Sequence, residues 1–552
     1  MSYEDGWPKS PYGNAPTSSG FGYQTGLSAF DIAVIQDKYG VNETTRTGND
    51  VYVLPEANSP AIFNPDGTLA SKATGYTSIW DAGGIDEIRY DGARNATIDL
   101  RPATLKYEVG GGGWMSYTTG ATPVYAGFTV ANGVVIENAT SGSGNDTLVG
   151  NSARNILDGG AGNDTFVLTE GGDDRAIGGS GNDVFAFRGA MTSADEVDGG
   201  EGNDQISIQG DYATAPLTLG SKVVNVESLA LNPGNDTRRG DPGTNFYDYN
   251  IITSNENVAA GVQFRVDGAR LRAGEDFTFD GSAETDGSFR VTGGLGVDRF
   301  TGGNGSDVFY FGPGVTGAGT FGASDVVDGG AGAARDQLAL RGDYALTFGA
   351  AQLVSIESLL LQSGRDVPQN TDFDYAITMI DANLVGGRMT VDTAQLRATE
   401  SVNFNGGAED DGSFRIFGGA GGDTFAGSQL GDSIEGQGGA DTLIGNGGND
   451  SFVYRNAAHS TASAQDRILD FTLGDLIDVG GIDAQPGGGN DAFSFIGSNA
   501  FTNQAGQLRV EQTQTAGTWL VQGDVDGNGS ADLQLLVTVS DGHQLTQADF
   551  IV

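Results

Sequence analysis

The sequence predicts an all-β fold: a parallel β-roll or β-solenoid built from nonapeptide repeats, with a short N-terminal helical segment and a C-terminal β cap. Three observations predict it. Gly makes up 91 of the 552 residues, more than twice its ordinary usage. A nonapeptide rich in Gly and Asp recurs in three blocks. In the last block Asp441 follows Asp423, and Asp450 follows Asp432, at intervals of 18 residues, as expected if two nonapeptides form one coil.

The charge balance narrows the classes of function. The chain has 72 acidic residues against 28 Lys and Arg, a formal net charge of -44. Such a surface repels nucleic acid and anionic membranes, and it attracts divalent cations. Cysteine is absent, so a secreted chain would need a cross-link other than disulfides, and metal is the obvious candidate. We expect no membrane span and no Sec-type N-terminal signal peptide, because no apolar run is long enough and the first thirty residues lack a basic start.

The first regular element is a predicted helix over residues 28–40. Its apolar side chains, Phe30, Ile32, Val34, Ile35 and Tyr39, fit an amphipathic stripe.

The nonapeptides, such as GGAGNDTFV (159–167) and GNGGNDSFV (445–453), read as metal-binding turns. Their glycines permit backbone φ above zero, so the chain can turn tightly with its carbonyl groups pointing inward. The Asp adds a carboxylate, and Ca²⁺ takes about six to eight oxygen ligands, so two stacked turns would complete one site. The apolar residue two positions after the Asp would enter a short strand and face the core. The pattern resembles the calcium-binding repeat of RTX proteins.

The predicted ligands in these turns are the repeated aspartates. They are Asp146, Asp164, Asp183 and Asp204 in the first block, Asp298 and Asp307 in the second, and Asp423, Asp432, Asp441 and Asp450 in the third. Asn155 replaces Asp in one turn, and TEGGDDRAI (169–177) is degenerate, so weaker sites are expected there. Plain hairpin turns are the alternative, which so many copies in register disfavour.

Two longer segments between the blocks are duplicated. FDGSAETDGSFRVTGGLGVDRF (279–300) resembles FNGGAEDDGSFRIFGGAGGDTF (404–425), and VVNVESLAL (223–231) resembles LVSIESLLL (353–361). We interpret both modules as further solenoid coils whose core depends less on metal.

A last acidic loop lies near the C-terminal end, in GDVDGNGSAD (523–532). Its Asp524, Asp526, Asn528 and Asp532 are spaced as in a calcium loop. An Asn-Gly hairpin turn between two strands explains the same residues equally well.

Both ends of the chain resemble serralysin-type zinc metalloproteases. Met1-Ser2-Tyr3 matches that family's Met-turn, TTRTGNDVY (44–52), SIWDAGGIDEI (78–88) and VVIENATSGSGNDTL (134–148) follow in the family's order, and AQDRILDFTLGDLIDVGGID (464–483) resembles its final module. The resemblance implies calcium sites in the lead-in to the roll. The implied contributors are Arg46, Gly48 and Asp50, facing Asp81, Gly83, Gly84 and Asp86, with Glu137 completing a neighbouring site.

The family's catalytic motif is missing from this sequence. A zinc peptidase site needs histidines one helical turn apart and a third ligand. The chain has two histidines, His459 and His543, and neither belongs to such a motif. We therefore expect no peptidase activity from the chain as given, and zinc only if a missing upstream catalytic domain exists.

The resemblance also implies a route out of the cell. The ending Asp549-Phe550-Ile551-Val552 looks like the uncleaved signal of proteases that leave through a type I secretion exporter. Our first interpretation is an extracellular, calcium-binding, non-catalytic part of a serralysin-like peptidase that serves calcium-driven folding and secretion. The alternative is a stand-alone secreted RTX adhesin or surface-layer protein that binds a surface or glycan.

The expected segments run as follows: 1–45, a catalytic-domain remnant; 46–140, a β lead-in; 141–210, 293–342 and 418–455, the nonapeptide blocks; 211–292 and 343–417, the inserted modules; and 456–552, the cap with the secretion signal.

Overall fold

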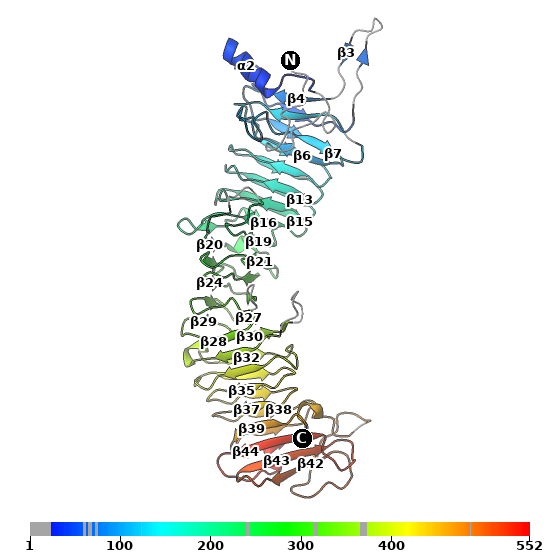
Figure 1. Ribbon diagram of the computed structural model, residues 1–552, viewed down its shortest axis with the longest axis vertical. Coiled ribbons are helices and arrows are strands. Elements are labelled where there is room, and N and C mark those ends of the chain that lie inside the picture. The colour runs from blue at the N-terminus through cyan, green and yellow to red at the C-terminus, as the bar shows by residue number, and fades with distance from the viewer. Residues whose placement is uncertain are drawn as a thin grey trace. The chain divides into compact units, whose positions relative to one another are not determined.

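The computed structural model confirms the all-β class, with parallel strands stacked as successive rungs (Figure 1). It describes residues 24–58, 62–63, 69–71, 75–122, 124–238, 243–313, 318–364, 372–485 and 487–552. Met1-Ser2-Tyr3 therefore lies outside the described residues. The chain forms two compact units, Met1–Asp267 and Gly268–Val552. No helix among the described residues is both long and apolar enough to cross a membrane.

In the first unit, two faces of the coils are parallel sheets. One consists of β1 (Val51–Val53), β5 (Glu87–Arg89), β9 (Asn138–Thr140), β11 (Ile156–Asp158), β13 (Arg175–Ser180), β15 (Glu196–Glu201) and β18 (Val223–Val224). The other consists of β6 (Asn95–Asp99), β10 (Thr147–Val149), β12 (Thr165–Val167), β14 (Val184–Ala186), β16 (Gln205–Ile208), β19 (Ser228–Leu231) and β21 (Gln263–Asp267), with β7 (Tyr117–Thr119) antiparallel to β6. Smaller pairs are β2 (Ile62–Phe63) with β3 (Leu69–Ser71), β4 (Tyr76–Ile79) with β8 (Gly127–Val130), and β17 (Leu217–Thr218) with β20 (Tyr249–Ile252).

In the second unit, the long parallel face runs from the inserted coils to the C-terminal residues. It consists of β23 (Ser288–Thr292), β25 (Val308–Phe311), β27 (Gln337–Arg341), β30 (Ser358–Gln362), β32 (Arg388–Asp392), β34 (Ser413–Phe417), β36 (Ser433–Glu435), β38 (Ser451–Val453), β40 (Leu476–Asp478) and β45 (Phe550–Ile551). The opposite strands are β22 (Phe277–Asp280), β24 (Asp298–Thr301), β26 (Val326–Asp328) and β29 (Leu353–Val354), then β28 (Tyr344–Thr347), β31 (Tyr375–Thr378), β33 (Val402–Asn405), β35 (Thr424–Ala426), β37 (Thr442–Ile444) and β39 (Asp466–Phe471).

The cap closes the second unit with a change of strand direction. β44 (Leu533–Val539) is parallel to β39, whereas β43 (Thr518–Asp524) and β42 (Gln507–Gln512) add as antiparallel strands, followed by β41 (Ser494–Phe495). Residues 464–483 form β39 and β40, which lie in different sheets because they are the two faces of one coil.

The core consists of columns of apolar side chains. Each side chain in a column belongs to the residue two positions after a nonapeptide Asp. Leu148, Phe166, Phe185 and Ile206 lie opposite one another in register, and all are fully buried. The rings of Phe166 and Phe185 stack with centroids 4.7 Å apart. Each such side chain contributes roughly 1.5–3 kcal/mol by leaving water. The predicted role of these residues in the nonapeptide is confirmed.

Helix α2 (Ala29–Tyr39) confirms the expected N-terminal helix. Ser28 caps it, because its Oγ accepts the N–H of Asp31 and the Asp31 carboxylate accepts the N–H of Ser28. The predicted stripe is wrong in part: Ala29 and Ile32 are buried, whereas Val34, Ile35 and Tyr39 are exposed. The buried face of the helix is therefore narrower than the sequence pattern predicts.

The two inserted modules fold alike. Asn257 and Asn383, in the 3₁₀ helices η1 (Asn255–Asn257) and η3 (Asp381–Asn383), donate their side-chain amides to the carbonyls of Gly220 (2.9 Å) and Gly349 (2.8 Å). In the second module, β30 and β32 lie between β27 and β34 in one parallel sheet. This module therefore continues the coils.

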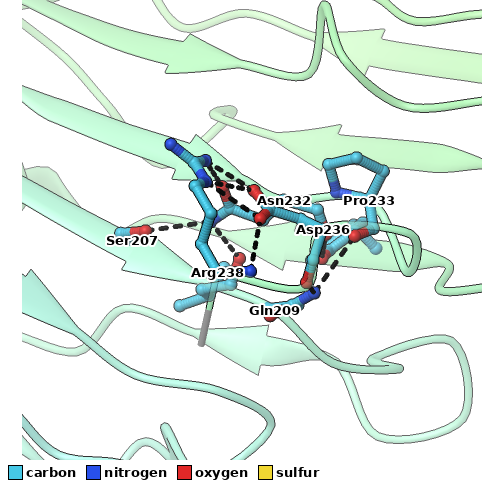
Figure 2. A network of polar contacts seen from close by, with 8 residues as sticks. Ser207, Gln209, Asn232, Pro233, Asp236 and Arg238 are labelled. Carbon is cyan, nitrogen blue, oxygen red and sulfur yellow. Dashed lines mark hydrogen bonds and ion pairs between the residues drawn. The ribbon is translucent and has the colours of Figure 1, made fainter. Parts of the chain in front are cut away.

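One polar network occurs in the first module without a counterpart of the same residues in the second (Figure 2). Asn232 Nδ2 donates to Ser207 Oγ (2.8 Å), and Gln209 Nε2 donates to the carbonyls of Pro233 (3.1 Å) and Asp236 (2.7 Å). These hydrogen bonds attach the loop after β19 to the buried side chains of Ser207 and Gln209 in the preceding coil. Ala339 and Arg341 replace Ser207 and Gln209 in the second module.

Candidate metal centres

The nonapeptide aspartates of the first unit form a ladder from coil to coil. The N–H of Asp146 donates to Oδ1 of Asp164 (2.7 Å), the N–H of Asp164 to Oδ1 of Asp183 (2.7 Å), and the N–H of Asp183 to Oδ1 of Asp204 (2.7 Å). The N–H of Asp204 donates to the Glu227 carboxylate (2.6 Å), which ends the ladder. Each carboxylate thus accepts one bond from the preceding coil and lies buried between coils.

The predicted aspartates of the second unit form the same contacts. All but Asp298 accept a backbone N–H of the preceding coil on a carboxylate oxygen, whereas the Asp298 carboxylate accepts the N–H of Gly294 in its own turn (3.0 Å). The donor and acceptor pairs are Phe289 to Asp307 (2.6 Å), Val402 to Asp423 and Asp423 to Asp441 (2.8 Å each), and Phe414 to Asp432 (2.5 Å) and Asp432 to Asp450 (2.8 Å). Asp298 also donates its N–H to Asp325 (2.8 Å).

The second carboxylate oxygen is what makes the ladders chemically unusual. Within the described residues, several of these oxygens are buried and accept no hydrogen bond. They are Oδ2 of Asp86, Asp146, Asp164, Asp183, Asp204, Asp441 and Asp466, and Oδ1 of Asp298. An unpaired buried carboxylate oxygen is costly. Repeated oxygen donors at the turns are the ligand set that Ca²⁺ prefers, so the residues present fit calcium.

Glycine permits the close stacking of these turns. Gly162 has φ 120° and Gly181 has φ 132°. A Cβ at Gly162 would lie 1.9 Å from the carbonyl oxygen of Gly144, and one at Gly181 would lie 1.8 Å from that of Gly162. Any larger residue would therefore push neighbouring coils apart.

Burial raises the pKa of the ladder aspartates. The pKa of Asp164 and of Asp441 is raised from 3.8 to about 8, because burial disfavours the charge and neighbouring ladder carboxylates add to the effect. The pKa of Asp450 rises to about 7 for the same reasons. Without a cation, the folded chain therefore prefers these groups protonated.

A pH dependence follows for the calcium-free chain. Between pH 3.8 and about 8, folded Asp164 and Asp441 hold a proton that the unfolded chain releases. Their contribution to stability is full below pH 3.8 and is lost as the pH rises through about 8, at roughly 1.4 kcal/mol per pH unit per group. Melting of chelator-treated protein from pH 4.5 to 8.5 (chosen about the cited window) should show the melting temperature falling with pH. A melting temperature that rises with pH in chelator would contradict it.

The lead-in residues implied by the family resemblance converge. One oxygen each from Asp50, Asp81 and Asp86 lies within 4.8 Å of the others. The N–H of Asp50 donates to Asp86 Oδ1 (2.8 Å), and the N–H of Asp86 donates to Glu137 (2.8 Å). Burial, then the charges of Asp81, Glu137 and Asp50, raise the pKa of Asp86.

The other implied lead-in residues shape the backbone around this cluster. The carbonyl of Gly48 faces Gly84, where a Cβ would lie 2.0 Å from it. The N–H of Gly83 donates to Asp81 Oδ1 (3.1 Å). Arg46 has φ 53°, and its guanidinium lies over the Tyr52 ring at 5.0 Å.

The C-terminal acidic loop joins β43 and β44 as a hairpin, and its carboxylates also converge. Asp524, Asp526 and Asp532 each place an oxygen within 4.8 Å of the others. Backbone N–H groups already occupy much of this set: Gly527 and Gly529 donate to Asp524 (2.8 and 2.9 Å), and Val525 donates to Asp532 (2.7 Å). Asn528 donates its side-chain amide to Asp526 (2.8 Å).

Sequence reasoning missed several ladder members. They are Asp174, Asp195, Asp325, Asp336, Asp466 and Asp475, with Glu227 and Glu357 in the same role. All but Asp174 are followed two positions later by a large apolar residue. That spacing was a usable signal even without the preceding glycines. Asn155 donates its N–H to Asp174 (2.8 Å), so the degenerate repeat keeps a ladder carboxylate.

The residues present do not fit a catalytic zinc. His543 Nδ1 is bonded to Asp541 Oδ1 (2.5 Å), and His459 lies in the 3₁₀ helix η4 (Ala457–His459). Neither histidine belongs to a group of three metal-ligating side chains among the described residues.

Comparison with known proteins gives a consistent result. The family model described as "Peptidase M10 serralysin C terminal" matches residues 41–328 and 360–552. Metalloprotease AprA of Pseudomonas entomophila (strain L48) is 35% identical over 159 residues, 28% of this chain and 29% of that protein. A Serralysin C of Dickeya chrysanthemi is 43% identical over 128 residues, 23% of each chain. Serralysin of Proteus mirabilis is 36% identical over 128 residues, again 23% of each. The match thus spans less than a third of the length of these relatives.

Proposed function

Because this chain belongs to the family of serralysin C-terminal regions of the M10 peptidases, we propose that it is a secreted calcium-binding roll, the non-catalytic partner region of a metallopeptidase. Calcium would enter between successive coils and bridge their ladder carboxylates. The ladders, with their buried and unpartnered oxygens, carry this proposal.

The geometry supports the following ligand sets. In the roll, the ions would be held by the ladder aspartates together with the inward carbonyls of the glycine turns. In the lead-in, Asp50, Asp81, Asp86 and Glu137 would hold them, with the backbone of Arg46, Gly48, Gly83 and Gly84 shaping the site. The hairpin loop with Asp524, Asp526, Asn528 and Asp532 is a further candidate. When bound, calcium supplies positive charge where burial makes the carboxylates costly.

Direct calcium binding tests this function. Equilibrium dialysis of the full chain, with bound metal measured by mass spectrometry, should give on the order of ten ions per chain at millimolar free calcium. Magnesium at the same concentration should not substitute, since it demands near-octahedral geometry and retains its waters. Binding of one ion or none would reject the proposal.

We also propose that the C-terminal residues direct export through a type I exporter. In the folded chain β45 pairs with β40, Phe550 is buried, and Asp549 accepts the N–H of Thr546 (2.6 Å). Asp549 and Phe550 are thus covered after folding, whereas Ile551 remains exposed. An exporter that reads Phe550 would have to do so on an unfolded chain, which calcium-driven folding outside the cell would permit.

Deletion of residues 549–552 from the full chain should retain most of it inside cells that carry a serralysin-type exporter. Phe550→Leu, which keeps an apolar residue, serves as the control and should be exported. Undiminished appearance of the deleted chain in the medium would refute the signal assignment.

A further inference from the structure

A second kind of acidic site lies in the second inserted module, outside the ladders. One oxygen each from Asp381, Glu409 and Asp411 lies within 4.8 Å of the others. Asp381 begins η3, and the other two lie in the turn between β33 and β34. Asp381 and Asp411 are exposed, whereas Glu409 is fully buried.

Glu409 is the buried anchor of this cluster. Its Oε1 accepts the N–H groups of Asp411 (3.2 Å) and Gly412 (2.8 Å). Its Oε2 is buried and accepts no hydrogen bond within the described part of the chain. A buried carboxylate oxygen without a donor is a costly feature that a bound cation would offset.

Backbone contacts hold the two exposed carboxylates in place. Asp411 Oδ1 accepts the N–H of Gly386 (2.8 Å), and Asp381 Oδ1 accepts the N–H of Asp410 (3.2 Å). Each bond uses one oxygen of its carboxylate.

The first inserted module supplies a natural comparison. Glu284 matches Glu409: its Oε1 accepts the N–H of Gly287 (2.8 Å), and its Oε2 is likewise buried without a donor. Asp286 matches Asp411, but Asn255 stands where the second module has Asp381. The described residues of the first module form no cluster of three carboxylates. The turn therefore folds without the third carboxylate, so Asp381 is not needed to build it.

We propose that Asp381, Glu409 and Asp411 bind a divalent cation, Ca²⁺, at a site on the second module that no nonapeptide contributes to. All three ligands would be carboxylate oxygens. Asp381 and Asp411 are exposed to water, which suits a calcium ion that completes its coordination shell with water molecules. The dissociation constant expected for such a half-open site is about 10⁻⁴–10⁻³ M.

Substitution of the two exposed carboxylates one at a time tests this site. In the full chain, Asp381→Asn should bind one calcium ion fewer than the wild type in equilibrium dialysis at millimolar free calcium. Asp411→Asn, which keeps an oxygen that can accept the N–H of Gly386, should likewise bind one ion fewer. The control Asp286→Asn, in a module with two carboxylates, should leave the number unchanged.

The outcomes separate this site from the ladders. If Asp381→Asn binds as many ions as the wild type, the inference is wrong and the proposed function stands. If the wild type binds no calcium, the proposed function fails as well. If Asp381→Asn loses several ions because its coils are damaged, Asp411→Asn decides: the loss of one ion supports the site, and unchanged binding overturns it.

Discussion

Chelating calcium at neutral pH is expected to unfold the coils that carry the aspartate ladders. Without cations, carboxylates such as Asp164 and Asp441 oppose folding, because at neutral pH they can be buried only by taking up a proton, which costs free energy. At ten times its dissociation constant, each calcium ion adds roughly 1.4 kcal/mol. Ten ions would add on the order of 14 kcal/mol, as much as the whole stability of a typical domain, about 5–15 kcal/mol. Amide hydrogen exchange should show the ladder N–H groups losing protection in chelator.

The antiparallel strands of the cap are the internal control for that experiment. β42 and β43 pair through ordinary backbone bonds, without a ladder carboxylate between them. Their protection should survive lower calcium than that of Asp423 and Asp441, whose N–H groups donate to ladder carboxylates. Uniform loss across cap and coils at one calcium concentration would show that the ladders have no special role.

Asp441→Asn is expected to change stability in opposite directions with and without calcium. Asn keeps an oxygen that can accept the N–H of Asp423, now 2.8 Å from Asp441 Oδ1. In chelator at pH 7.5 (a neutral condition) it removes an ionisable group that can be buried only by taking up a proton, so the variant should be more stable by about 1–3 kcal/mol. In calcium it removes a charged ligand, so the calcium midpoint for folding should rise. Thermal melting of the variant and the wild type, in chelator and in calcium, measures both changes in stability.

Asp392→Asn is the matched control for Asp441→Asn. Asp392 also accepts a backbone N–H, from Ala394 (3.0 Å), but it lies outside the ladders. Its replacement should change stability by a few tenths of a kcal/mol in both conditions. An Asp441 variant that behaves like this control would mean that the carboxylate charge does not act through calcium.

Much of the fold could be predicted because the residues that specify it lie close together in the sequence. The Gly-rich turn, the Asp and the apolar residue two positions later specify turn, ladder and core within nine residues, as in Asp164 with Phe166. The 18-residue interval then fixed which aspartates meet, and the Asp423–Asp441 and Asp432–Asp450 contacts confirm it.

The rest depends on loops whose lengths the nonapeptide does not encode. Asp298 meets Asp325, 27 residues later, and Asp307 meets Asp336, 29 residues later. Asp325 follows a single nearby glycine, Gly322, and the glycines before Asp336 lie two residues further from it than in the nonapeptide, so only stacking of the whole coil reveals these partners. The sequence did not reveal the Asp381–Glu409–Asp411 cluster for the same reason. Its residues come from the 3₁₀ helix η3 and from a turn far from it in the sequence. Which face of α2 would be buried also depended on packing rather than on periodicity.

The central claim is that calcium in the ladders, rather than the apolar columns alone, holds this fold. Far-UV circular dichroism of the full chain tests it most directly, with calcium added stepwise to chelator-treated protein at neutral pH, removed again, and each state then heated. The account predicts that the β signal appears cooperatively with calcium and disappears on chelation. A chain equally rich in β structure and equally resistant to heat in chelator would contradict it, because apolar columns such as the one around Phe166 would then suffice.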